Sequence, residues 1–444
     1  MTLSAEILTI GDELLRGDLV DTNGSWLARR LFQLGVGVTR ILSTGDELEQ
    51  LTQHLTRALA AGTGLVLVTG GLGPTDDDRT SEAVARATGR PLELDQPTLE
   101  TLRWRFEQAG YPFTPNNEKQ AHFPRGATLI PNRRGTAPGF ALTHEATPHR
   151  TTIICLPGVP SEMKVMFDDT VVPLLQEVAE LPPSRARVLR VFGMGESQID
   201  QRLQGLLSTL DQGEMEISLH YQTSFPENQV ILVARGGQEQ ETTALLDRFE
   251  QEVRSRLGPR EIFGVDDTSF SDAVVGALRR AGATVALAES CTGGLAGDLI
   301  TRASGSSEVF ELGVVTYSNE FKHRMLEVPS DVLEQQGAVS RECVLAMAHG
   351  VRRLAGSTFG VAISGVAGPG GGTPDKPVGT VHFALAHEEG ERHLVRRFPW
   401  VEDRQRIKEI SAHVALALVL RHLVGGGSPD SDLFAGRWKP GAGR

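Results

Sequence analysis

Cysteine and aromatic residues are scarce in this 444-residue chain. Aromatics make up 5% of it, and the three cysteines, Cys155, Cys291 and Cys343, have no CxxC spacing. So sparse a set excludes a disulfide framework and a cysteine-based zinc site, and it fits a reducing compartment. No apolar run approaches the ~18 residues of a membrane span, and the N-terminus lacks the basic region of a signal peptide. We therefore expect a soluble cytoplasmic protein with no membrane partner.

Positive charge is also in deficit, because 44 Lys and Arg residues face 56 Asp and Glu and leave a net charge of -12. Broad nucleic-acid binding needs a basic face that displaces counterions from phosphates, so nucleic acid is not the expected ligand. A local basic patch remains compatible with this sum. Glycine, in contrast, is abundant at 49 residues and shows no collagen period. That pattern indicates loops and tight turns near ligands.

The order of apolar patterns divides the chain into three segments and a tail. In the first segment (1–180), short β-branched runs alternate with helical stretches, for example over 5–11, 23–35, 38–45, 48–62 and 64–73. This βαβαβ order predicts a doubly wound α/β fold with a parallel sheet. The middle segment (186–262) follows a linker at Pro182 and Pro183 and is typical of a small α+β domain, with its first helix expected over 196–210.

The third segment (268–424) alternates strands and helices again and predicts another α/β domain. We expect a helix over 270–282, a strand ending at Ser290, a helix that opens at Cys291, and a long helix over 404–424. Residues 425–444 are rich in glycine and proline and are predicted to be disordered.

Loops that follow the strands hold the candidate ligand residues of the first segment, since ligands of doubly wound folds bind at the carboxyl ends of strands. Gly70, Gly71 and Gly73 would let the backbone approach a phosphate. The aspartates at 76–78 follow at once and suggest a divalent metal shared with the substrate's oxygens. The alternative is that the glycines only make turns and the aspartates cap the helix over 80–87. Three such loops in one domain favour a phosphate ligand.

These loops resemble a known family. GDELLRGDLVDTN (11–23), TGGLGPTDDDRT (69–80), GTAPG (135–139) and LPGVPSEM (156–163) are similar to the N-terminal, molybdopterin-binding-like domain of the competence/damage-inducible CinA family. The resemblance implies a metal-dependent ADP-ribose pyrophosphatase that releases AMP and ribose 5-phosphate. It makes Asp77 and Asp78 the metal ligands, with Asp78 catalytic. The metal would be cobalt, magnesium or manganese, with potassium as a further candidate. The implied binding residues are Asp21, Asn23, Gly70, Gly71, Gly73, Gly135, Thr136 and Gly158. Molybdopterin or another nucleotide remains an alternative ligand.

AESCTGG (288–294) places Ser290 between a β-run and a glycine pair, where a strand passes into a helix. A serine there is exposed, and the backbone N–H groups that follow could form an oxyanion hole. Cys291 is a rival nucleophile, although a small apolar residue is more often in the core. The alternative role for Ser290 or Thr292 is to cap the helix.

The serine needs a base, and YSNEFK (317–322) offers Tyr317 and Lys322, with His323 next to them as a rival. A desolvated lysine that is neutral at pH 7 can take the serine proton, and a tyrosine can pass a proton to the leaving group. The alternative is a solvent-facing pair at a strand end.

SGVAGPGGGTPDKPVGTV (364–381) is the densest glycine cluster of the chain. It predicts either a phosphate-binding loop, with Arg404 or Arg406 as the cation, or a long hairpin connection. Together with AESCTGG and VVTYSNEFK, it resembles the nicotinamide mononucleotide deamidase that forms the C-terminal domain of the CinA family. The resemblance makes Ser290 the nucleophile, Lys322 the base and Tyr317 the proton relay, without a cofactor. Thr292 and Gly293 would lie at the oxyanion, and Arg404, Gly365 and Gly368 near the phosphate.

Two hypotheses follow from these resemblances. The first is a bifunctional enzyme of pyridine-nucleotide recycling that acts on nicotinamide mononucleotide and ADP-ribose. The second is a molybdopterin- or nucleotide-binding scaffold for competence or recombination partners. The resemblance places a KH-like domain in the middle segment, where GMGES (193–197) is acidic and RNA binding is not expected. A spacer or homodimer-forming role fits this segment better.

Overall fold

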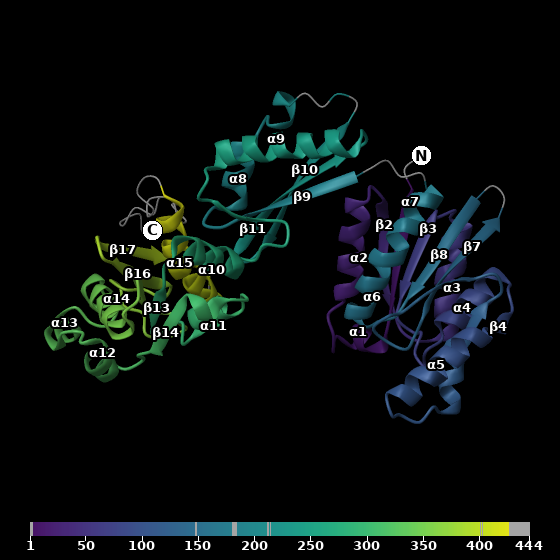
Figure 1. The fold of residues 1–444 in the computed structure, drawn as a ribbon, viewed down its shortest axis with the longest axis horizontal. Helices are drawn as coiled ribbons and strands as arrows, with labels where there is room; N and C mark the ends of the chain where they lie inside the picture. Colours follow the sequence, from purple (N-terminus) through teal and green to yellow (C-terminus); the bar gives the residue numbers. More distant parts are fainter. Residues whose placement is uncertain are drawn as a thin grey trace. The chain divides into compact units, whose positions relative to one another are not determined.

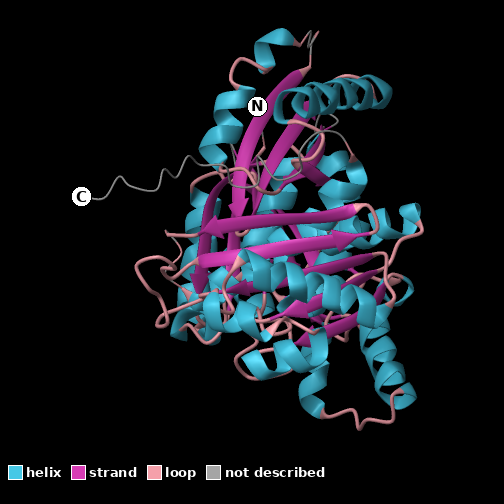
Figure 2. Cartoon of the chain, turned by 90° about the vertical axis from the view of Figure 1, so that its left-hand side faces the viewer, coloured by secondary structure: helices cyan, strands magenta, loops and turns pink. Residues whose placement is uncertain are grey.

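The computed structural model describes residues 3–146, 149–179, 184–210, 213, 215–399, 401 and 403–425. Pro182 and Pro183 of the predicted linker and residues 426–444 of the predicted tail lie outside this set. Contacts group the described parts of 1–185, 214–216 and 234–243 into one unit, and those of 186–213, 217–233 and 244–444 into a second. Helices and strands are mixed in both units (Figures 1 and 2).

The sheet of the first segment has the strand order β2–β1–β3–β8–β7–β6. Its strands are β1 (Ser4–Ile10), β2 (Gly37–Thr44), β3 (Leu65–Thr69), β6 (Thr128–Ile130), β7 (Gly139–Ala146) and β8 (His149–Leu156). β1 pairs parallel with β2 and β3, and β3 pairs parallel with β8, whereas β7 is antiparallel to both of its neighbours. The predicted parallel order is therefore confirmed, and the loops after β1, β3 and β8 meet at one edge of the sheet.

Helices cover both faces of this sheet (Figure 1), which confirms the doubly wound arrangement. One face packs against α2 (Thr22–Gln33), α6 (Pro160–Met166) and α7 (Val172–Ala179), and the other against α3 (Leu48–Ala60) and α4 (Thr80–Thr88). The remaining elements are α1 (Asp12–Arg16), β4 (Leu92–Leu94), α5 (Gln96–Gln108), β5 (His122–Pro124) and short 3-10 and π helices at Pro115–Ala121 and Phe167–Val171.

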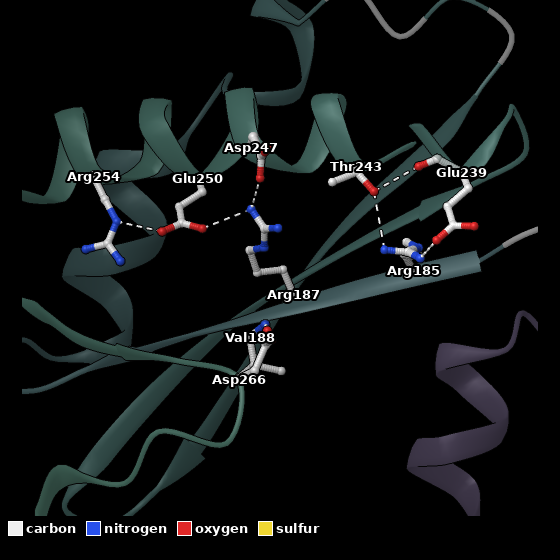
Figure 3. Close-up of polar contacts among 9 residues, drawn as sticks. All are labelled: Arg185, Arg187, Val188, Glu239, Thr243, Asp247, Glu250, Arg254 and Asp266. Carbon is white, nitrogen blue, oxygen red and sulfur yellow. Dashed lines mark hydrogen bonds and ion pairs between the residues drawn. The ribbon is translucent and has the colours of Figure 1, made fainter. Parts of the chain in front are cut away.

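The middle segment has a sheet of order β10–β11–β9–β12 with two helices. The strands are β9 (Ser184–Val191), β10 (Glu216–Ser224), β11 (Glu227–Arg235) and β12 (Ile262–Val265), and the helices are α8 (Glu196–Leu203) and α9 (Glu239–Leu257). Arginines of β9 face acidic side chains of α9 (Figure 3). Arg187 donates to Asp247 at 2.5 Å and Glu250 at 3.0 Å, and Arg185 pairs with Glu239. These cations are neutralised within the segment, so this face offers little free positive charge.

The third segment contains a five-stranded sheet of order β14–β13–β15–β16–β17. Its strands are β13 (Val285–Glu289), β14 (Phe310–Val315), β15 (Phe359–Gly365), β16 (Thr380–His387) and β17 (Gly390–Arg397). β13 pairs parallel with β14 and β15, and β16 is antiparallel to β15 and β17. Parallel pairing of the first three strands directs the ends of β13, β14 and β15 to one edge.

Helices α10 (Phe270–Ala281), α11 (Leu295–Thr301) and α15 (Arg404–Val424) pack on one face of this sheet. The other face carries α14 (Arg341–Ala355), and α12 (Asn319–Leu326) and α13 (Ser330–Gln335) complete the segment. The long final helix is confirmed with its predicted bounds. Near its C-terminal end, Arg421 donates to the carbonyl of Phe192 at 3.3 Å, and Phe192 packs against Phe270.

Two predicted helices were wrong at one end. The helix expected over 196–210 ends at Leu203, because Gln204 is extended and Gly205 has a φ of 74°. The helix expected to open at Cys291 begins only at Leu295, because Gly293 and Gly294 both adopt positive φ angles that end the preceding turn. In the part of the chain that the structure describes, no helix has the length and apolar character needed to cross a bilayer.

At Gly350 the backbone of α14 lies close to the backbone of α12. A Cβ there would fall on the carbonyl oxygen of Leu326 in α12, whereas a Cβ at Gly276 of α10 would meet only the end of the Arg280 side chain. Alanine normally stabilises a helix interior by about 1 kcal/mol over glycine, but overpacking costs about 1–3 kcal/mol. We expect Gly350→Ala to destabilise the protein and Gly276→Ala to stabilise it, as measured by urea denaturation. Equal shifts for both variants would contradict this close approach.

Candidate functional site

A cavity of about 850 Å³ lies at the edge where β1, β3 and β8 of the first segment end. Nine of the predicted residues line it: Asp21, Asn23, Gly70, Gly71, Gly73, Asp77, Asp78, Thr136 and Gly158. Gly135 is not among the lining residues. Its N–H donates to Asn132 Oδ1 at 2.8 Å and its carbonyl accepts from Arg105 at 2.6 Å. Gly135 thus shapes the loop that presents Thr136 to the cavity.

Asn23 connects the loops around this cavity. Its side-chain amide donates to Thr69 Oγ1 at 3.2 Å and to the Gly158 carbonyl at 2.7 Å, and its Oδ1 is buried without a partner in the described part of the chain. Asp21 caps α2 by accepting from the Gly24 N–H at 2.8 Å. These two side chains hold the entry of α2 against the ends of β3 and β8.

The predicted metal ligands lie on the loop after β3. Asp78 accepts from the Thr75 N–H at 2.9 Å, and neither Asp77 nor Asp78 caps α4, whose N-cap is Arg79 without a side-chain bond. The alternative that these aspartates cap the helix is therefore wrong. A hydrogen bond from Thr75 lowers the pKa of Asp77. Burial, and then the negative charges of Asp12 and Asp77, raise the pKa of Asp46 across the cleft.

Among the described residues, no group of three or more His, Cys, Asp or Glu side chains is arranged to hold a metal ion. Magnesium usually binds through one or two carboxylates and completes its coordination with water and substrate phosphates. Asp77 and Asp78 are oxygen donors on the cavity wall, so they fit such an ion when a phosphorylated ligand supplies the other oxygens.

Ser290 and Lys322 meet in the third segment. Ser290 directly follows β13, and its Oγ lies 3.2 Å from Nζ of Lys322 on α12. Lys322 is only 1% exposed, and its amine also donates to the carbonyls of Thr316 at 2.8 Å and Tyr317 at 3.3 Å. Burial lowers the pKa of Lys322, which raises its neutral fraction near pH 7. The nucleophile and base predicted from sequence are thus within hydrogen-bond distance.

Cys291 and His323, the rival nucleophile and the rival base, are not arranged for these roles. Burial raises the pKa of the Cys291 thiol to about 12, so at neutral pH it is not the reactive thiolate. Nδ1 of His323 lies 2.8 Å from the Val328 carbonyl and 3.5 Å from Ser330 Oγ. Neither residue is engaged with Ser290 as nucleophile or base.

Glu289 binds backbone amides at the start of α11. Its buried carboxylate accepts backbone N–H groups of Gly294 at 3.0 Å, Ala296 at 3.1 Å and Gly297 at 2.8 Å. The Gly293 N–H donates to the Ser290 carbonyl at 3.1 Å. The amides of Gly293, Gly294, Ala296 and Gly297 are therefore already bonded, and an oxyanion hole formed by the amides that directly follow Ser290 stays a prediction. The sequence signal was a glutamate directly before the serine and five residues before Gly294.

Thr292, by contrast, keeps an unpaired group. It is fully buried, and its hydroxyl has no partner in the described part of the chain. The alternative that Ser290 or Thr292 caps the helix is wrong, since the N-cap of α11 is Gly294 and it receives no side-chain bond.

Arg404 joins the glycine loop to Tyr317. Its Nη1 donates to the Gly368 carbonyl at 2.6 Å and its Nη2 to the Tyr317 hydroxyl at 3.2 Å. Tyr317 is 63% exposed, and its hydroxyl is directed to Arg404, while its carbonyl accepts from Lys322. Arg406 lies elsewhere, with its guanidinium 5.0 Å from the centre of the Phe225 ring.

The glycine loop connects the antiparallel strands β15 and β16, so the predicted hairpin connection describes its geometry. Gly365 ends β15, where a Cβ would lie 2.7 Å from the Val381 side chain, and Gly368 has a φ of 77°. Both positions therefore require glycine, while Gly370 has open space around it. Open space at Gly370, in the same loop that Arg404 binds through Gly368, leaves room for an anion to approach the backbone.

Relatives identify the family. A CinA-like protein from Geobacter metallireducens is 44% identical over 423 residues, which cover 95% of this chain and 100% of the relative. The chain belongs to the CinA family. Another CinA-like protein, from Anaeromyxobacter sp., is 43% identical over 420 residues, covering 94% of this chain and 99% of the relative. A crystal structure described as competence/damage inducible protein CihA from Agrobacterium tumefaciens is 38% identical, covers 35% of this chain and 94% of its own, and has a TM-score of 0.33.

Family models match each segment of this CinA-like chain. The probable molybdopterin binding domain matches residues 6–177, the damage-inducible protein CinA KH domain residues 186–264, and the CinA C-terminal domain residues 267–423. The family resemblance and the three-part fold class are confirmed. The roles of individual residues, the cofactors and the partners stay predictions.

Burial of the thiols makes a direct prediction. Burial raises the pKa of Cys155 well above its usual value, that of Cys291 to about 12 and that of Cys343 to about 11. At pH 8 we expect iodoacetamide to alkylate Cys343 about 10²-fold and Cys291 about 10³-fold more slowly than a free thiol, because their thiolate fractions are that small, and Cys155 to react more slowly than a free thiol as well. Mass spectrometry of the native and urea-unfolded protein measures the ratio. Native labelling of Cys291 at the rate of a free thiol would restore it as a rival nucleophile.

Proposed function

We propose that the third segment hydrolyses the carboxamide of nicotinamide mononucleotide to nicotinic acid mononucleotide and ammonia. The observation that carries this proposal is the 3.2 Å approach of the buried Lys322 amine to Ser290 Oγ. A lysine amine is rarely buried without a compensating role, and one that is neutral at pH 7 can accept a hydroxyl proton.

The proposed reaction has two steps. Ser290 Oγ attacks the carboxamide carbon as Lys322 takes its proton, and the C–N bond then breaks as that proton passes to the leaving amine. Water attacks the resulting acyl-serine, gives its proton back through Lys322, and frees the carboxylate and Ser290. Tyr317 is the predicted relay to departing ammonia, and its hydroxyl must then turn from Arg404 toward the substrate.

We propose that the substrate's phosphate binds between Arg404 and the glycine loop. The guanidinium carries five N–H donors, and its bonds to Gly368 and Tyr317 leave others for a phosphate. Thr292 remains the candidate at the oxyanion side, because it belongs to the turn after Ser290 and its hydroxyl has no partner in the part of the chain that the structure describes.

For the first segment we propose metal-dependent hydrolysis of ADP-ribose to AMP and ribose 5-phosphate. The cavity with glycine amides on one loop and Asp77 and Asp78 beside them supports a diphosphate ligand held with a divalent ion such as cobalt, magnesium or manganese. A bound ion would neutralise the phosphate charge there. The family match to a probable molybdopterin binding domain favours a molybdopterin as the second candidate ligand.

We propose a spacer or homodimer-forming role for the middle segment. The ion pairs of β9 with α9 support this assignment over RNA binding, since they leave Arg185 and Arg187 without free charge for phosphates. The alternative hypothesis is a scaffold protein that binds competence or recombination partners. In that case only one of the two candidate sites, or neither, would be active.

Ammonia release tests the amidase. With nicotinamide mononucleotide, we expect Ser290→Ala and Lys322→Met to lower the rate of release about 10³-fold or more, because each removes half of the nucleophile–base pair. His323→Ala is the matched control and should keep the rate within about 2-fold, since His323 is bonded to Val328. Undiminished release by Ser290→Ala would overturn the nucleophile.

AMP release from ADP-ribose tests the first segment. We expect Asp78→Ala to lower it about 10²-fold or more in the presence of divalent metal, and a chelator to abolish it. Asp76→Ala is the control, because Asp76 belongs to the same acidic string but is exposed and lies outside the cavity lining. Liquid chromatography of the products measures both. Equal losses in the two variants would show that the loop, and not the Asp78 carboxylate, is required.

A further inference from the structure

Glu289 is a buried carboxylate to which the proposed reaction gives no role. It is the last residue of β13, directly before Ser290, and only 2% exposed. One carboxylate oxygen accepts from the Gly294 and Ala296 N–H groups and the other from the Gly297 N–H. A buried carboxylate is costly unless it is hydrogen-bonded, and these three bonds compensate it.

The same residue also holds the loop that carries the base. The Glu289 carbonyl accepts from the Thr316 N–H at 2.9 Å, and the Thr316 carbonyl accepts from Lys322 Nζ at 2.8 Å. The Ser290 N–H donates to the Ile363 carbonyl at 3.0 Å. The carboxylate therefore anchors the turn after Ser290, while the carbonyl anchors the loop before Lys322.

We propose that Glu289 is the positioning residue of the amidase site, which fixes Ser290 Oγ relative to Lys322 Nζ. This role rests on the proposed function. The turn over 291–294 contains two glycines with positive φ angles, and glycine backbones have many alternative conformations. A carboxylate that binds the far end of this turn restricts it, and the serine at its near end is restricted with it.

Its charge also constrains the reaction. The carboxylate already occupies the positive end of α11, and a second negative charge beside it would be repelled. The oxyanion of the tetrahedral intermediate is therefore directed away from the start of α11. Thr292 belongs to the same turn, and its buried hydroxyl has no partner among the described residues.

Glu289→Gln tests the role with little change of volume. The glutamine side chain keeps one oxygen acceptor, but its NH₂ group faces a backbone N–H that the second carboxylate oxygen had accepted. Because two donors cannot bond to each other, we expect the turn over 291–294 to loosen. We expect kcat for ammonia release to fall about 10²-fold, the effect of misplacing a reacting group by about 1 Å. KM for nicotinamide mononucleotide should stay within about 2-fold of the wild type, because Glu289 does not face the substrate, and hydrolysis of ADP-ribose by the same full-length protein should not change.

The pH profile separates positioning from simple loss of stability. Burial lowers the pKa of Lys322, and the nearby Cys343 and Cys291 thiols oppose this shift. Loosening of the turn admits water to the amine, so its pKa rises and the acid limb of kcat/KM moves to higher pH. Asp272→Asn is the matched control, because Asp272 is an acid in the first turn of α10 whose carboxylate, among the described residues, accepts hydrogen bonds from Ser269 alone. Its kcat and pH profile should match the wild type.

Glu289→Asp is the second variant, which keeps the charge but shortens the reach by one methylene. It should also lower kcat with KM preserved. Wild-type kcat in either folded Glu289 variant, or lower thermal stability with an unmoved acid limb, overturns the positioning role and leaves Glu289 as a stabiliser of α11. Wild-type protein that releases no ammonia would overturn the proposed function, and this role with it.

Discussion

The burial of the Lys322 amine constrains the loops around Ser290 in the third segment. Removing a lysine side chain from water is costly, and the amine of Lys322 is compensated by two carbonyls and by Ser290 Oγ. Those carbonyls belong to the loop between β14 and α12, so that loop must follow β14 closely and return toward β13. The same burial lowers the pKa of the amine, so structural compensation and chemical activation have one cause.

Both candidate sites use the edge of a sheet where parallel strands end. In the first segment the loops after β1, β3 and β8 surround the cavity, and Asn23 bonds to the end of β3 and to the loop after β8. In the third segment the ends of β13 and β14 and the loop after β15 surround Ser290. Abundant glycine has a physical reason at these places, since Gly70, Gly71 and Gly368 have positive φ angles and lie on such loops.

The sequence predicted what depends on periodicity and on short motifs. Alternating strands and helices predicted the two α/β sheets, and the apolar run over 404–424 predicted α15. The approach of Ser290 to Lys322 followed from resemblance, because 32 residues separate them and no local pattern relates them. The hydrogen-bond partner of the His323 ring could not be predicted from the sequence. Only the folded chain shows that the ring bonds to the Val328 carbonyl and not to Ser290. Glu289 was missed because a glutamate next to a serine has no periodic signature, and its three partners become a set only in the folded turn.

Helix α15 links two features that were described separately. Its first residue, Arg404, holds the glycine loop and Tyr317, and near its other end Arg421 bonds to Phe192 of the middle segment. Its 21 residues form a rod about 30 Å long, and most of its side chains are buried in the core. The contact with the middle segment and the contacts of the candidate phosphate site are therefore made by the two ends of one buried helix.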